Sequence, residues 1–577
     1  MRLEASLLIA YLAGAECLQS QRLTLGTRTP DPFVLFAGGY DKLAWQNGFT
    51  TCEEETAVVL EGEALPQDLE GTYFRNGHAK YEVGKDQVMH PFDADGMITA
   101  CTIKDGRCTF RNRFVATEGF RRERRYKKIL YRGAFGTKRS GGFLANAFDL
   151  KQKNVANTNV IYWAGRLLAL WEGGLPHRLE PDSLRTLGDY RFRGLLKKQD
   201  TFSAHPRVDA KSGRLVNFSA KQGGTGPSTI VVSEFEPGSV EAARQRSFQV
   251  NNKLVFFHDF VVTEKYYVFN EAPLSLDPVP FLLGNKGPAE CMSFDKSKPA
   301  VLHLVPRDPT DPLVRTVNVD PHFNFHFANA FDGPDGTVVF DVVKSNDLFL
   351  GDTSDSPQPI WKTINYERDV AFSKLHRYTL TPVDSAASSY TFTERELSST
   401  QVEFPSVNPR VSCRPHRFIY ASCGSDELRS TPVQGLVKLD TVKGVEEKWM
   451  PEAHEFLGES IFVERKGVSS GSTASTATER EEDDGYVISF LFNGRDMKTD
   501  LVVFDAQKVK DGPISRLQLP VKVPFGLHGS FAPGLVFDSE AVLRRHKAAK
   551  ALDTKSGWGE MTGGFSGLGI VYDFKDY

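Results

Sequence analysis

The sequence predicts an all-β fold, a β-propeller with seven blades, and three observations support this prediction. Short runs rich in Val, Ile, Phe, Tyr and Thr recur from about residue 60 onward, separated by clusters of Gly, Asp, Asn and Pro. Groups of these runs end in similar phrases, such as HRYTLTPVDS and LVKLDTVKG. The 42 phenylalanines and 17 tyrosines suit strands better than helices. Small antiparallel sheets repeated around an axis protect their edges by closing into a ring.

Seven groups of strands follow one another along the chain. They cover residues 96–115, 160–188, 214–236, 266–306, 337–381, 417–442 and 486–508. A chain of 577 residues is long enough for three or four domains of ordinary size, but closed β folds are an exception to that count. We therefore expect a single propeller domain over residues 35–540.

Three segments fall outside the strand pattern. Residues 1–30 contain an apolar run that ends in small residues, which predicts a targeting leader, or alternatively a disordered N-terminus or an amphipathic membrane-contact helix. Residues 467–484 are polar and of low complexity, so we expect a disordered surface loop there. Residues 541–577 are expected to form a C-terminal extension, with a helix over Glu540 to Lys555.

Composition excludes several classes of partner. The net charge of −3 gives no overall field that favours nucleic acid, and we expect neither a nucleic-acid partner nor an obligate protein partner. The seven cysteines are scattered without a CxxC motif, which argues against a disulfide framework and a cysteine-ligated metal. No apolar run reaches the roughly 18 residues of a spanning helix, so a soluble or peripheral protein is expected. The basic cluster at 121–128 is either a solvated helix face or a contact with anionic lipid.

Four of the thirteen histidines share a local context at strand ends, beside aromatic or β-branched residues and next to Pro, Asp or Gly. They are His205 in FSAHPRVD, His258 in VFFHDFVV, His326 in FNFHFANA and His528 in FGLHGSFA. One strand-end histidine from each of four blades can point along the propeller axis. Four unrelated buried histidines are the alternative. The more polar contexts of His78, His90, His177 and His416 predict surface or blade-linking roles.

Metal binding explains such a set better than proton transfer does, because a proton shuttle needs only one or two imidazoles. Four neutral imidazoles without a cysteine ligand suit Fe(II), with Zn, Cu and Ni as rivals. A histidine ligand usually donates its other ring N–H to a carboxylate. Glutamates embedded in apolar strand sequence are candidates for that role, although each alone is equally consistent with an exposed strand carboxylate; they are Glu172, Glu403 and Glu459.

Motifs along most of the chain carry a resemblance to a known family. They include GTYFRNG, HPFDADGM, SAHPRVD, HDFVVTEKYYVF, HFANAFD, EFPSVNP and LHGSF, in that order. The chain resembles the carotenoid cleavage oxygenases, which belong to the retinal pigment epithelial membrane protein superfamily, from about residue 35 to 540. The phrases FGTKRSGGFLANAFDLKQKN and DPVPFLLG are most similar to cyanobacterial-type apocarotenoid oxygenases.

The resemblance implies a seven-bladed propeller with a helical or loop cap over an axial metal site. It implies one Fe²⁺ per chain, held by the positions that match His205, His258, His326 and His528, with Glu172, Glu403 and Glu459 behind them. Thr158 matches a threonine that crowds one open iron position. Two residues depart from the family pattern and leave loop shape uncertain: His78, where Pro is usual, and Ala94, where Gly is usual.

The implied reaction is scission of one conjugated double bond of a carotenoid or apocarotenoid, with O₂ as co-substrate, to give two carbonyl products. The alternatives are cleavage of a stilbene-type phenylpropanoid on the same scaffold, and a retinoid or apocarotenoid isomerase or binder that cleaves nothing. An apolar tunnel must place the reacting bond. Its expected lining includes Phe256, Phe257, Phe325 and Phe327.

A substrate of this kind is nearly insoluble in water, so we expect the protein to draw it from a membrane surface. The apolar loop PVPFLLG is a candidate for contact with lipid, and a core-packing loop inside the cap is the alternative. Its apolar residues are Pro278, Val279, Phe281, Leu282 and Leu283. The resemblance and the leader together suggest a plastid, with membrane association in the cytoplasm as the alternative.

Overall fold

The computed structural model describes residues 39–62, 64–223, 226–252, 255–354, 356–384, 387–466 and 480–562. The predicted leader at 1–30 lies outside the described residues, as does the part of the predicted surface loop at 467–479. Six cysteines fall within the described ranges, and all six are buried and free. None of the helices in these ranges is long and apolar enough to cross a membrane.

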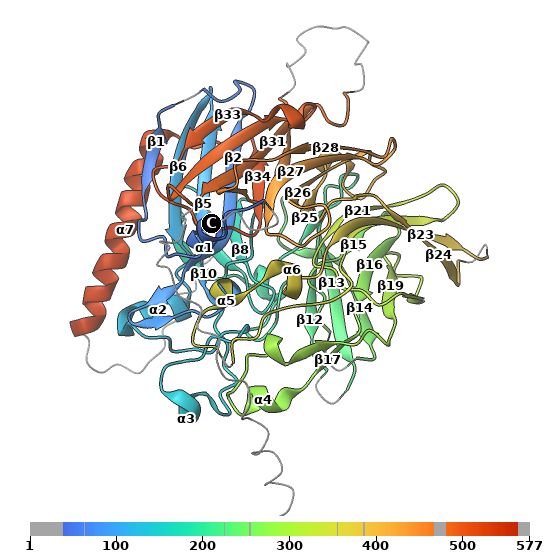
Figure 1. The fold of residues 1–577 in the computed structure, drawn as a ribbon, viewed down its shortest axis with the longest axis horizontal. Helices are drawn as coiled ribbons and strands as arrows, with labels where there is room; N and C mark the ends of the chain where they lie inside the picture. The colour runs from blue at the N-terminus through green and yellow to red at the C-terminus, as the bar shows by residue number, and fades with distance from the viewer. Residues whose placement is uncertain are drawn as a thin grey trace, which may run out of the picture. The chain divides into compact units, whose positions relative to one another are not determined.

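Seven antiparallel sheets form the blades of a β-propeller, as predicted (Figure 1). Blade 1 is β1 (Ala57–Leu60), β6 (Arg107–Phe114), β5 (Asp95–Lys104), β2 (Gly71–Lys80) and β34 (Gly529–Pro533). Blade 2 is β10 (Thr186–Asp189), β9 (His177–Leu179), β8 (Arg166–Leu170) and β7 (Asn159–Trp163). Blade 3 is β11 (Arg207–Val208), β12 (Leu215–Lys221), β13 (Ser228–Phe235) and β14 (Ala242–Val250).

The remaining blades follow in chain order. Blade 4 is β15 (Val261–Val262), β16 (Tyr266–Glu271), β19 (Ala300–Pro306) and β20 (Arg315–Val319). Blade 5 is β21 (Phe327–Asp332), β22 (Val338–Lys344), β23 (Lys374–Pro382) and β24 (Tyr390–Glu396). Blade 6 is β25 (Val402–Ser406), β26 (Phe418–Gly424), β27 (Val433–Asp440) and β28 (Val445–Trp449). Blade 7 is β29 (Glu455–Leu457), β30 (Ile461–Glu464), β31 (Gly485–Asn493), β32 (Lys498–Asp505) and β33 (Pro513–Gln518).

The ring is closed by β34, the last strand in the sequence, which joins the first blade. It pairs with β2 from Gly71 opposite Pro533 to Arg75 opposite Gly529. In Figure 1 the red end of the chain therefore lies beside the blue beginning. Because β1, β6, β5 and β2 come from the beginning of the propeller and β34 from its end, this pairing joins both ends of the propeller in one sheet.

The hydrophobic core consists of wedges between neighbouring blades. Each adjacent pair of blades shares one buried apolar cluster. Successive residues of a strand point to opposite faces, so they enter different wedges. Tyr266 packs between blades 4 and 5, whereas Tyr267 packs between blades 3 and 4. Central strands are consequently apolar on both faces, as in the fully buried interior of β16.

Short helices supply the cap that was expected over one end of the axis. They are α1 (Lys42–Asn47), α5 (Ile360–Thr363) and α6 (Tyr366–Asp369). The amide of Gln46 donates to the carbonyl of Trp361 at 3.0 Å, which ties α1 to α5. The C-terminal helix α7 (Ser539–Thr562) is separate from the cap and contacts β1 on the outside of blade 1 (Figure 1).

Three other helices lie on connections between strands. They are α2 (Glu118–Tyr126), α3 (Gly142–Asn146) and α4 (Pro278–Leu282). The PVPFLLG stretch was expected to be a loop, but it forms α4 because Asp277 caps the helix and Pro278 begins it. The basic cluster forms the exposed face of α2, with Phe120 and Glu123 on the buried face.

Small elements complete the connections. Two short hairpins are β3 (Glu82–Val83) with β4 (Asp86–Gln87), and β17 (Leu274–Leu276) with β18 (Met292–Phe294). Single turns of 3₁₀-helix are η1 (Pro91–Asp93), η2 (Phe192–Gly194), η3 (Ala289–Cys291), η4 (Pro409–Val411) and η5 (Val509–Asp511).

The four histidines predicted to have surface or blade-linking roles are all buried. His78, His90, His177 and His416 are each less than a tenth exposed. His416, just before β26 of blade 6, contacts the buried carboxylate of Asp341 in β22 of blade 5 at 2.8 Å, so it links two blades, as one of the two expected roles required. The surface alternative was wrong for all four residues, because polar neighbours in the sequence do not by themselves set the exposure of a side chain.

We predict that the ring closure tolerates no side chain at Gly77. A Cβ atom there would lie 2.5 Å from the Cα of Gly526, in the backbone that leads to His528. Gly77→Ala should therefore lower the free energy of unfolding by about 1–3 kcal/mol. Gly226→Ala is the matched control, because its Cβ would meet no atom within 4 Å. Thermal unfolding of the two variants checks the prediction, and equal midpoints would contradict it.

Candidate metal centre

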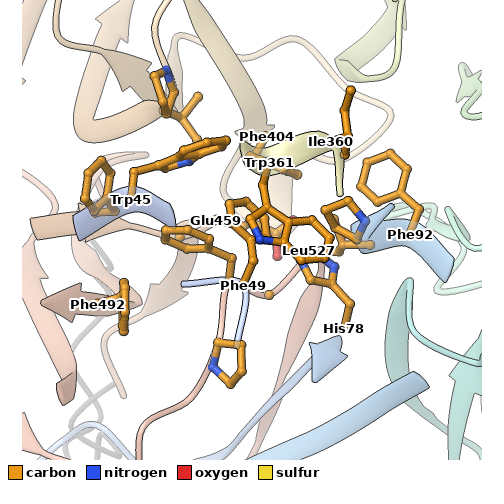
Figure 2. Close-up of a pocket in the computed structure, with 18 of the residues that line it drawn as sticks. Trp45, Phe49, His78, Phe92, Ile360, Trp361, Phe404, Glu459, Phe492 and Leu527 are labelled. Atoms are coloured by element: carbon orange, nitrogen blue, oxygen red, sulfur yellow. The ribbon is translucent and has the colours of Figure 1, made fainter. Parts of the chain in front are cut away.

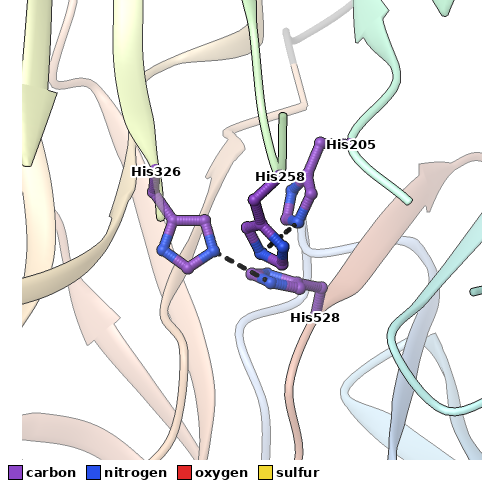
Figure 3. Close-up of side chains that lie close together, drawn as sticks. All are labelled: His205, His258, His326 and His528. Atoms are coloured by element: carbon purple, nitrogen blue, oxygen red, sulfur yellow. Dashed lines mark hydrogen bonds between the residues drawn. The ribbon is translucent and has the colours of Figure 1, made fainter. Parts of the chain in front are cut away.

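The four predicted histidines meet on the propeller axis (Figure 3). Each one comes just before the innermost strand of a blade: His205 before β11, His258 before β15, His326 before β21 and His528 before β34. These strands converge at the axis, so residues far apart in sequence arrive at one point. Their common strand-end context in the sequence reflects this shared position.

The ring nitrogens are spaced as ligands of one ion would be. The Nε2 atoms of His205 and His258 are 3.0 Å apart, and those of His326 and His528 are 3.2 Å apart. One possible ligand atom from each of the four residues lies within 4.8 Å of the others. When two nitrogens each lie about 2.1 Å from a metal ion and the nitrogen–metal–nitrogen angle is a right angle, the nitrogens are about 3.0 Å apart. The donor set therefore fits a single first-row divalent ion.

The other three blades also place a polar residue at the axis. Thr158 precedes β7, Glu403 lies in β25, and Glu459 lies between β29 and β30. The carbonyl of Thr158 accepts the backbone N–H of His528 at 3.0 Å, and its hydroxyl donates to Asn157 at 3.2 Å. Every blade thus contributes one residue to the centre, and Glu172, which follows β8, adds a second from blade 2.

Each of the three predicted glutamates lies against the Nδ1 atom of a different histidine. The distances are 2.6 Å from Glu172 to His258, 2.5 Å from Glu403 to His326 and 2.7 Å from Glu459 to His528. A carboxylate at Nδ1 holds the proton there and leaves Nε2 free as a donor to a metal ion. Hydrogen bonds to Glu403 and Glu459 therefore orient the rings of His326 and His528. Glu172 places a negative charge against His258, but the two atoms do not have hydrogen-bond geometry.

Burial and neighbouring charges act in opposite directions on these groups. Burial lowers the pKa of His205 well below its ordinary value, and the three adjacent imidazoles lower it further. Burial also lowers the pKa of His258, but the carboxylates of Glu172, Asp259 and Glu403 together outweigh burial, and the net shift is upward. Burial would raise the pKa of Glu459, yet His528 and Arg75 lower it overall. Glu459 is thus held as a carboxylate.

Glu459 also links the centre to the ring closure. Its Oε2 accepts Nη1 of Arg75 at 2.8 Å and the backbone N–H of Gly529 at 2.8 Å. Arg75 comes from β2 and Gly529 begins β34, the two strands that close the ring. The carboxylate that orients His528 is therefore held by the strand pairing that closes the propeller.

A mostly apolar cavity of about 280 Å³ opens onto the histidines, and we call it the metal cavity. Its walls include His258, His326 and His528 together with Thr158, Glu172 and Glu403. Of the predicted tunnel residues, Phe256 and Phe325 line it. The Phe325 ring stands edge-on to His258 with the ring centres 5.2 Å apart.

The other two predicted tunnel residues do not face the metal cavity. Phe327 is 1% exposed and packs between blades 4 and 5. Phe257 packs between blades 3 and 4, against Phe269. Phe327, at the start of β21, is thus a core residue, which corrects the expectation for this position. Phe257 also lines a neighbouring cavity of about 340 Å³ that shares Phe256 with the metal cavity.

Sequence reasoning missed Phe404 and Trp171, which also line the metal cavity. The Phe404 ring lies 5.2 Å from that of His326 and 5.4 Å from that of His528. Its backbone has φ of 54°, and the pairing of β25 with β26 shifts register between Glu403 and Ser406. A bulge with a left-handed residue turns this side chain toward the axis, and residue type alone does not predict that.

Two further cavities adjoin the metal cavity. The first has about 310 Å³, and we call it the aromatic cavity because Trp45, Phe49, Trp361 and Phe492 line it (Figure 2). It shares Phe325, Phe404 and Leu527 with the metal cavity. The second has about 340 Å³, and we call it the outer cavity. It shares Phe135, Trp171, Glu172 and Phe256 with the metal cavity.

The fold and the centre together define a class: a seven-bladed propeller with four histidines on its axis arranged to hold one divalent metal ion. The family profile described as retinal pigment epithelial membrane protein matches residues 48–533. The chain belongs to this family, which the sequence motifs had indicated.

Individual relatives match over most of their length. Apocarotenoid-15,15'-oxygenase of Synechocystis sp. is 35% identical over 503 residues, which cover 85% of this chain and 97% of that protein. Lignostilbene-alpha,beta-dioxygenase isozyme III of Sphingomonas paucimobilis is 30% identical, covering 82% of this chain and 93% of that protein. The crystal structure of cobalt-substituted Synechocystis ACO matches with a TM-score of 0.78 and 35% identity, covering 86% of this chain and 100% of that chain.

We predict that Glu403→Gln weakens metal binding by about 10- to 100-fold, because the amide no longer fixes His326 with a negative charge. Glu271→Gln is the matched control. Glu271 contacts His303 at 2.8 Å, in a similar pair outside the metal centre. Titration with Co²⁺, followed by its visible absorption, measures the affinity of each variant. Equal weakening in both variants would show that the effect is not specific to the centre.

Proposed function

We propose that this protein is a non-haem Fe(II)-dependent dioxygenase that cleaves one conjugated double bond of an apocarotenoid or carotenoid with O₂, giving two aldehyde or ketone products. The observation that carries the proposal is a four-histidine group on the axis that opens into an apolar cavity. Several relatives are named as oxygenases or dioxygenases of such substrates, among them the Synechocystis apocarotenoid oxygenase and the carotenoid 9,10(9',10')-cleavage dioxygenase of Pisum sativum.

His205, His258, His326 and His528 would hold the iron. When bound, the iron supplies the activation of O₂, for which side chains have no equivalent. Four neutral imidazoles leave the ion its full charge. Hydrogen bonds to Glu403 and Glu459 keep two of the rings in one tautomer, and Glu172 places a negative charge against a third. Thr158 lies on the wall beside His528, where it narrows the space next to the centre.

The other residues of the metal cavity position the substrate and exclude water. Phe256, Phe325, Phe404 and Trp171 present flat apolar surfaces on which a planar polyene can lie. No acid or base has to act on such a substrate, because one C=C bond and O₂ give two carbonyl groups with no overall gain or loss of a proton. The selection of one double bond among many similar ones depends on where the ends of the molecule come to rest.

Stilbene cleavage is a second candidate, because one relative is named lignostilbene-alpha,beta-dioxygenase. A phenolic substrate needs polar partners for its hydroxyl groups, and a lysine near a tyrosine would serve. Among the described residues that line the metal and aromatic cavities there is a tyrosine, Tyr366, but no lysine. The lining therefore favours the more apolar substrate.

We predict oxygen-dependent aldehyde formation when the protein is loaded with Fe(II) anaerobically and then given O₂ and an apocarotenal. Chromatography of the product pair identifies the bond that is cut. His326→Ala should reduce product to background, because it removes a ligand. His454→Ala is the control, since this half-buried histidine lies outside the cavity linings. If only a stilbene yields aldehydes, the substrate assignment is wrong; if nothing does, so is the reaction.

We also propose that an apolar surface patch docks the protein on a membrane. Its exposed residues come from α4 and from the α3 segment: Leu144, Phe148, Leu150, Val279 and Leu283. The backbone N–H of Phe148 donates to the carbonyl of Leu282 at 2.8 Å, which joins the two segments. Of the predicted lipid contacts, Phe281 is half-buried and lies under the guanidinium of Arg132 at 4.3 Å. The sequence indicated α4 but not the α3 segment.

Basic side chains border this patch. The guanidinium carbon of Arg122, in α2, lies 5.6 Å from the centre of the Tyr131 ring. The Nζ atom of Lys151, next to Leu150, lies 5.0 Å from the same ring centre. Anionic lipid would be attracted by such charges. The outer cavity is lined by Leu276, Ala289 and Met292, on the segments that flank α4, and it leads inward to the metal cavity. A substrate dissolved in a membrane thus has a short apolar route to the centre, and we propose a plastid membrane as its source.

Substitution of the patch should release the protein from lipid. We predict that Phe148→Ser combined with Val279→Ser lowers the fraction that sediments with vesicles containing anionic lipid, and also lowers cleavage of vesicle-borne substrate. Leu428→Ser is the control, because Leu428 is 90% exposed but lies in blade 6. Unchanged sedimentation of the double variant would exclude the patch as the docking surface.

A further inference from the structure

A glutamine on the wall of the metal cavity carries a hydrogen-bond donor without an acceptor. Gln401 comes directly before β25 of blade 6, and it lines the metal cavity. The Nε2 atom of Gln401 donates no hydrogen bond to any described residue, yet the atom is not enclosed by protein. Because the residue as a whole is only 4% exposed, its accessible amide faces the cavity and not the outer surface. A ligand in the metal cavity can therefore reach this donor.

The other end of the Gln401 amide fixes its orientation. Oε1 accepts the backbone N–H of Thr431 at 2.8 Å, in a buried contact. A backbone N–H can only donate, so the atom that it meets is the oxygen and the NH₂ group is left without an acceptor. The backbone carbonyl of Gln401 accepts the N–H of Gly424 at 3.0 Å, which continues the pairing of β25 with β26. The donor is thus held in place by two backbone contacts.

Most other polar side chains on this wall already have partners in the protein. The hydroxyls of Ser345 and Ser373 each donate to a backbone carbonyl at 2.8 Å. The side-chain amide of Asn157 donates to two backbone carbonyls, at 3.0 and 2.8 Å. Tyr366, which lines the metal and aromatic cavities, also has a hydroxyl that bonds no described residue. A phenol hydroxyl both donates and accepts, whereas the NH₂ group of Gln401 only donates, so Gln401 discriminates in favour of an acceptor.

Gln401 lies across the propeller axis from the outer cavity. The outer cavity shares Trp171 and Glu172 with the metal cavity, and both residues follow β8 of blade 2. Blades 7 and 1 separate blade 6 from blade 2 on one side of the ring, and blades 3, 4 and 5 separate them on the other. A linear molecule that enters through the outer cavity and passes the histidines on the axis therefore points toward Gln401.

The donor also has a fixed position relative to the metal centre. Glu403, two residues after Gln401, contacts Nδ1 of His326 at 2.5 Å. Gln401 and Glu403 both line the metal cavity, whereas Val402 between them is buried in the core, as alternation along an extended chain requires. Two residues of extended chain span about 6.6 Å. An end group bound by Gln401 is thus held at a set distance from the metal centre, and this distance determines which double bond lies there.

We infer that Gln401 is a specificity-determining residue whose side-chain amide donates a hydrogen bond to a carbonyl or hydroxyl oxygen at one end of the linear polyene substrate. This inference rests on the proposed function for the identity of the substrate. A hydrocarbon end would displace water from the amide and supply no acceptor, which costs free energy. A site that hydrogen-bonds one substrate discriminates against the analogue that lacks the bonding group.

The test gives two substrates together to the full-length, metal-loaded protein. One is an apocarotenal, and the other is the polyene of equal chain length with a methyl group in place of the aldehyde. The ratio of their products measures the ratio of kcat/KM, and it does not depend on the fraction of protein that is folded. We expect the wild type to prefer the apocarotenal by about tenfold, the equivalent of about 1.4 kcal/mol. Gln401→Met, which removes the amide with little change in volume, should abolish the preference.

Gln434→Met is the matched control. Gln434 is another buried glutamine of blade 6, it donates to the carbonyl of Glu452 at 3.2 Å, and it lies outside the linings of the metal and aromatic cavities. Both substitutions remove a hydrogen bond, so both should lower the unfolding midpoint, but Gln434→Met should keep the wild-type preference. An equal loss of preference in the two variants would trace it to destabilisation and overturn the inference.

A third variant tests the neighbouring hydroxyl. Tyr366→Phe removes only the phenolic oxygen, and we expect it to retain the preference for the apocarotenal. Loss of the preference in Tyr366→Phe together with its retention in Gln401→Met would assign the selection to the tyrosine and refute the role of Gln401.

A binding measurement separates this inference from the proposed reaction. Quenching of tryptophan fluorescence under anaerobic conditions reports binding without cleavage, because Trp171 lines the metal cavity. If the wild type cleaves neither compound but binds the apocarotenal more tightly in a Gln401-dependent way, the proposed reaction fails and the inference stands. If Gln401→Met keeps the wild-type preference in both binding and cleavage, the inference is overturned.

Discussion

The constraint on which the rest of the structure depends is the convergence of seven innermost strands on one axis. Each blade is a sheet with a buried face toward each neighbour, so it cannot shift without opening two hydrophobic wedges. The start of each inner strand is therefore fixed to within the tolerance of a packed core. Four of these fixed points carry imidazoles and three carry other polar groups, and the geometry of the centre needs no support from flexible loops.

Electrostatic interactions as well as packing determine the arrangement of the four histidines. Four imidazoles brought together would repel one another if they were protonated, and burial favours the neutral form. The glutamates sit on the far side of three rings, where they hold protons away from the nitrogens that face one another. The negative charge is thus present near the centre without occupying a ligand position. This arrangement leaves the apolar cavity in front of the histidines available for a hydrocarbon.

The sequence predicted which residues lie at the strand ends near the axis. It did not predict to which face of a strand each side chain points. The blade number and the axial histidines are encoded locally, in turn residues and in the apolar context of each strand. The Phe257 and Phe327 side chains point into hydrophobic wedges between blades. The residues next to them in the sequence do not show into which wedge each side chain points. His78 follows the polar pair Arg75 and Asn76, yet its strand is buried. The bend that brings in Phe404 is a backbone property that residue type does not reveal.

The pairing of β2 with β34 has a consequence for biosynthesis. A ribosome completes His205, His258 and His326 long before it reaches His528, so the nascent chain carries an incomplete set of ligands for 202 residues. Arg75, near the beginning, finds its partner Glu459 only when blade 7 has been made. Until the final strand emerges, the growing polypeptide cannot offer a cation all four donors at once. The complete four-histidine group is thus assembled only in a chain whose propeller has been translated to its end.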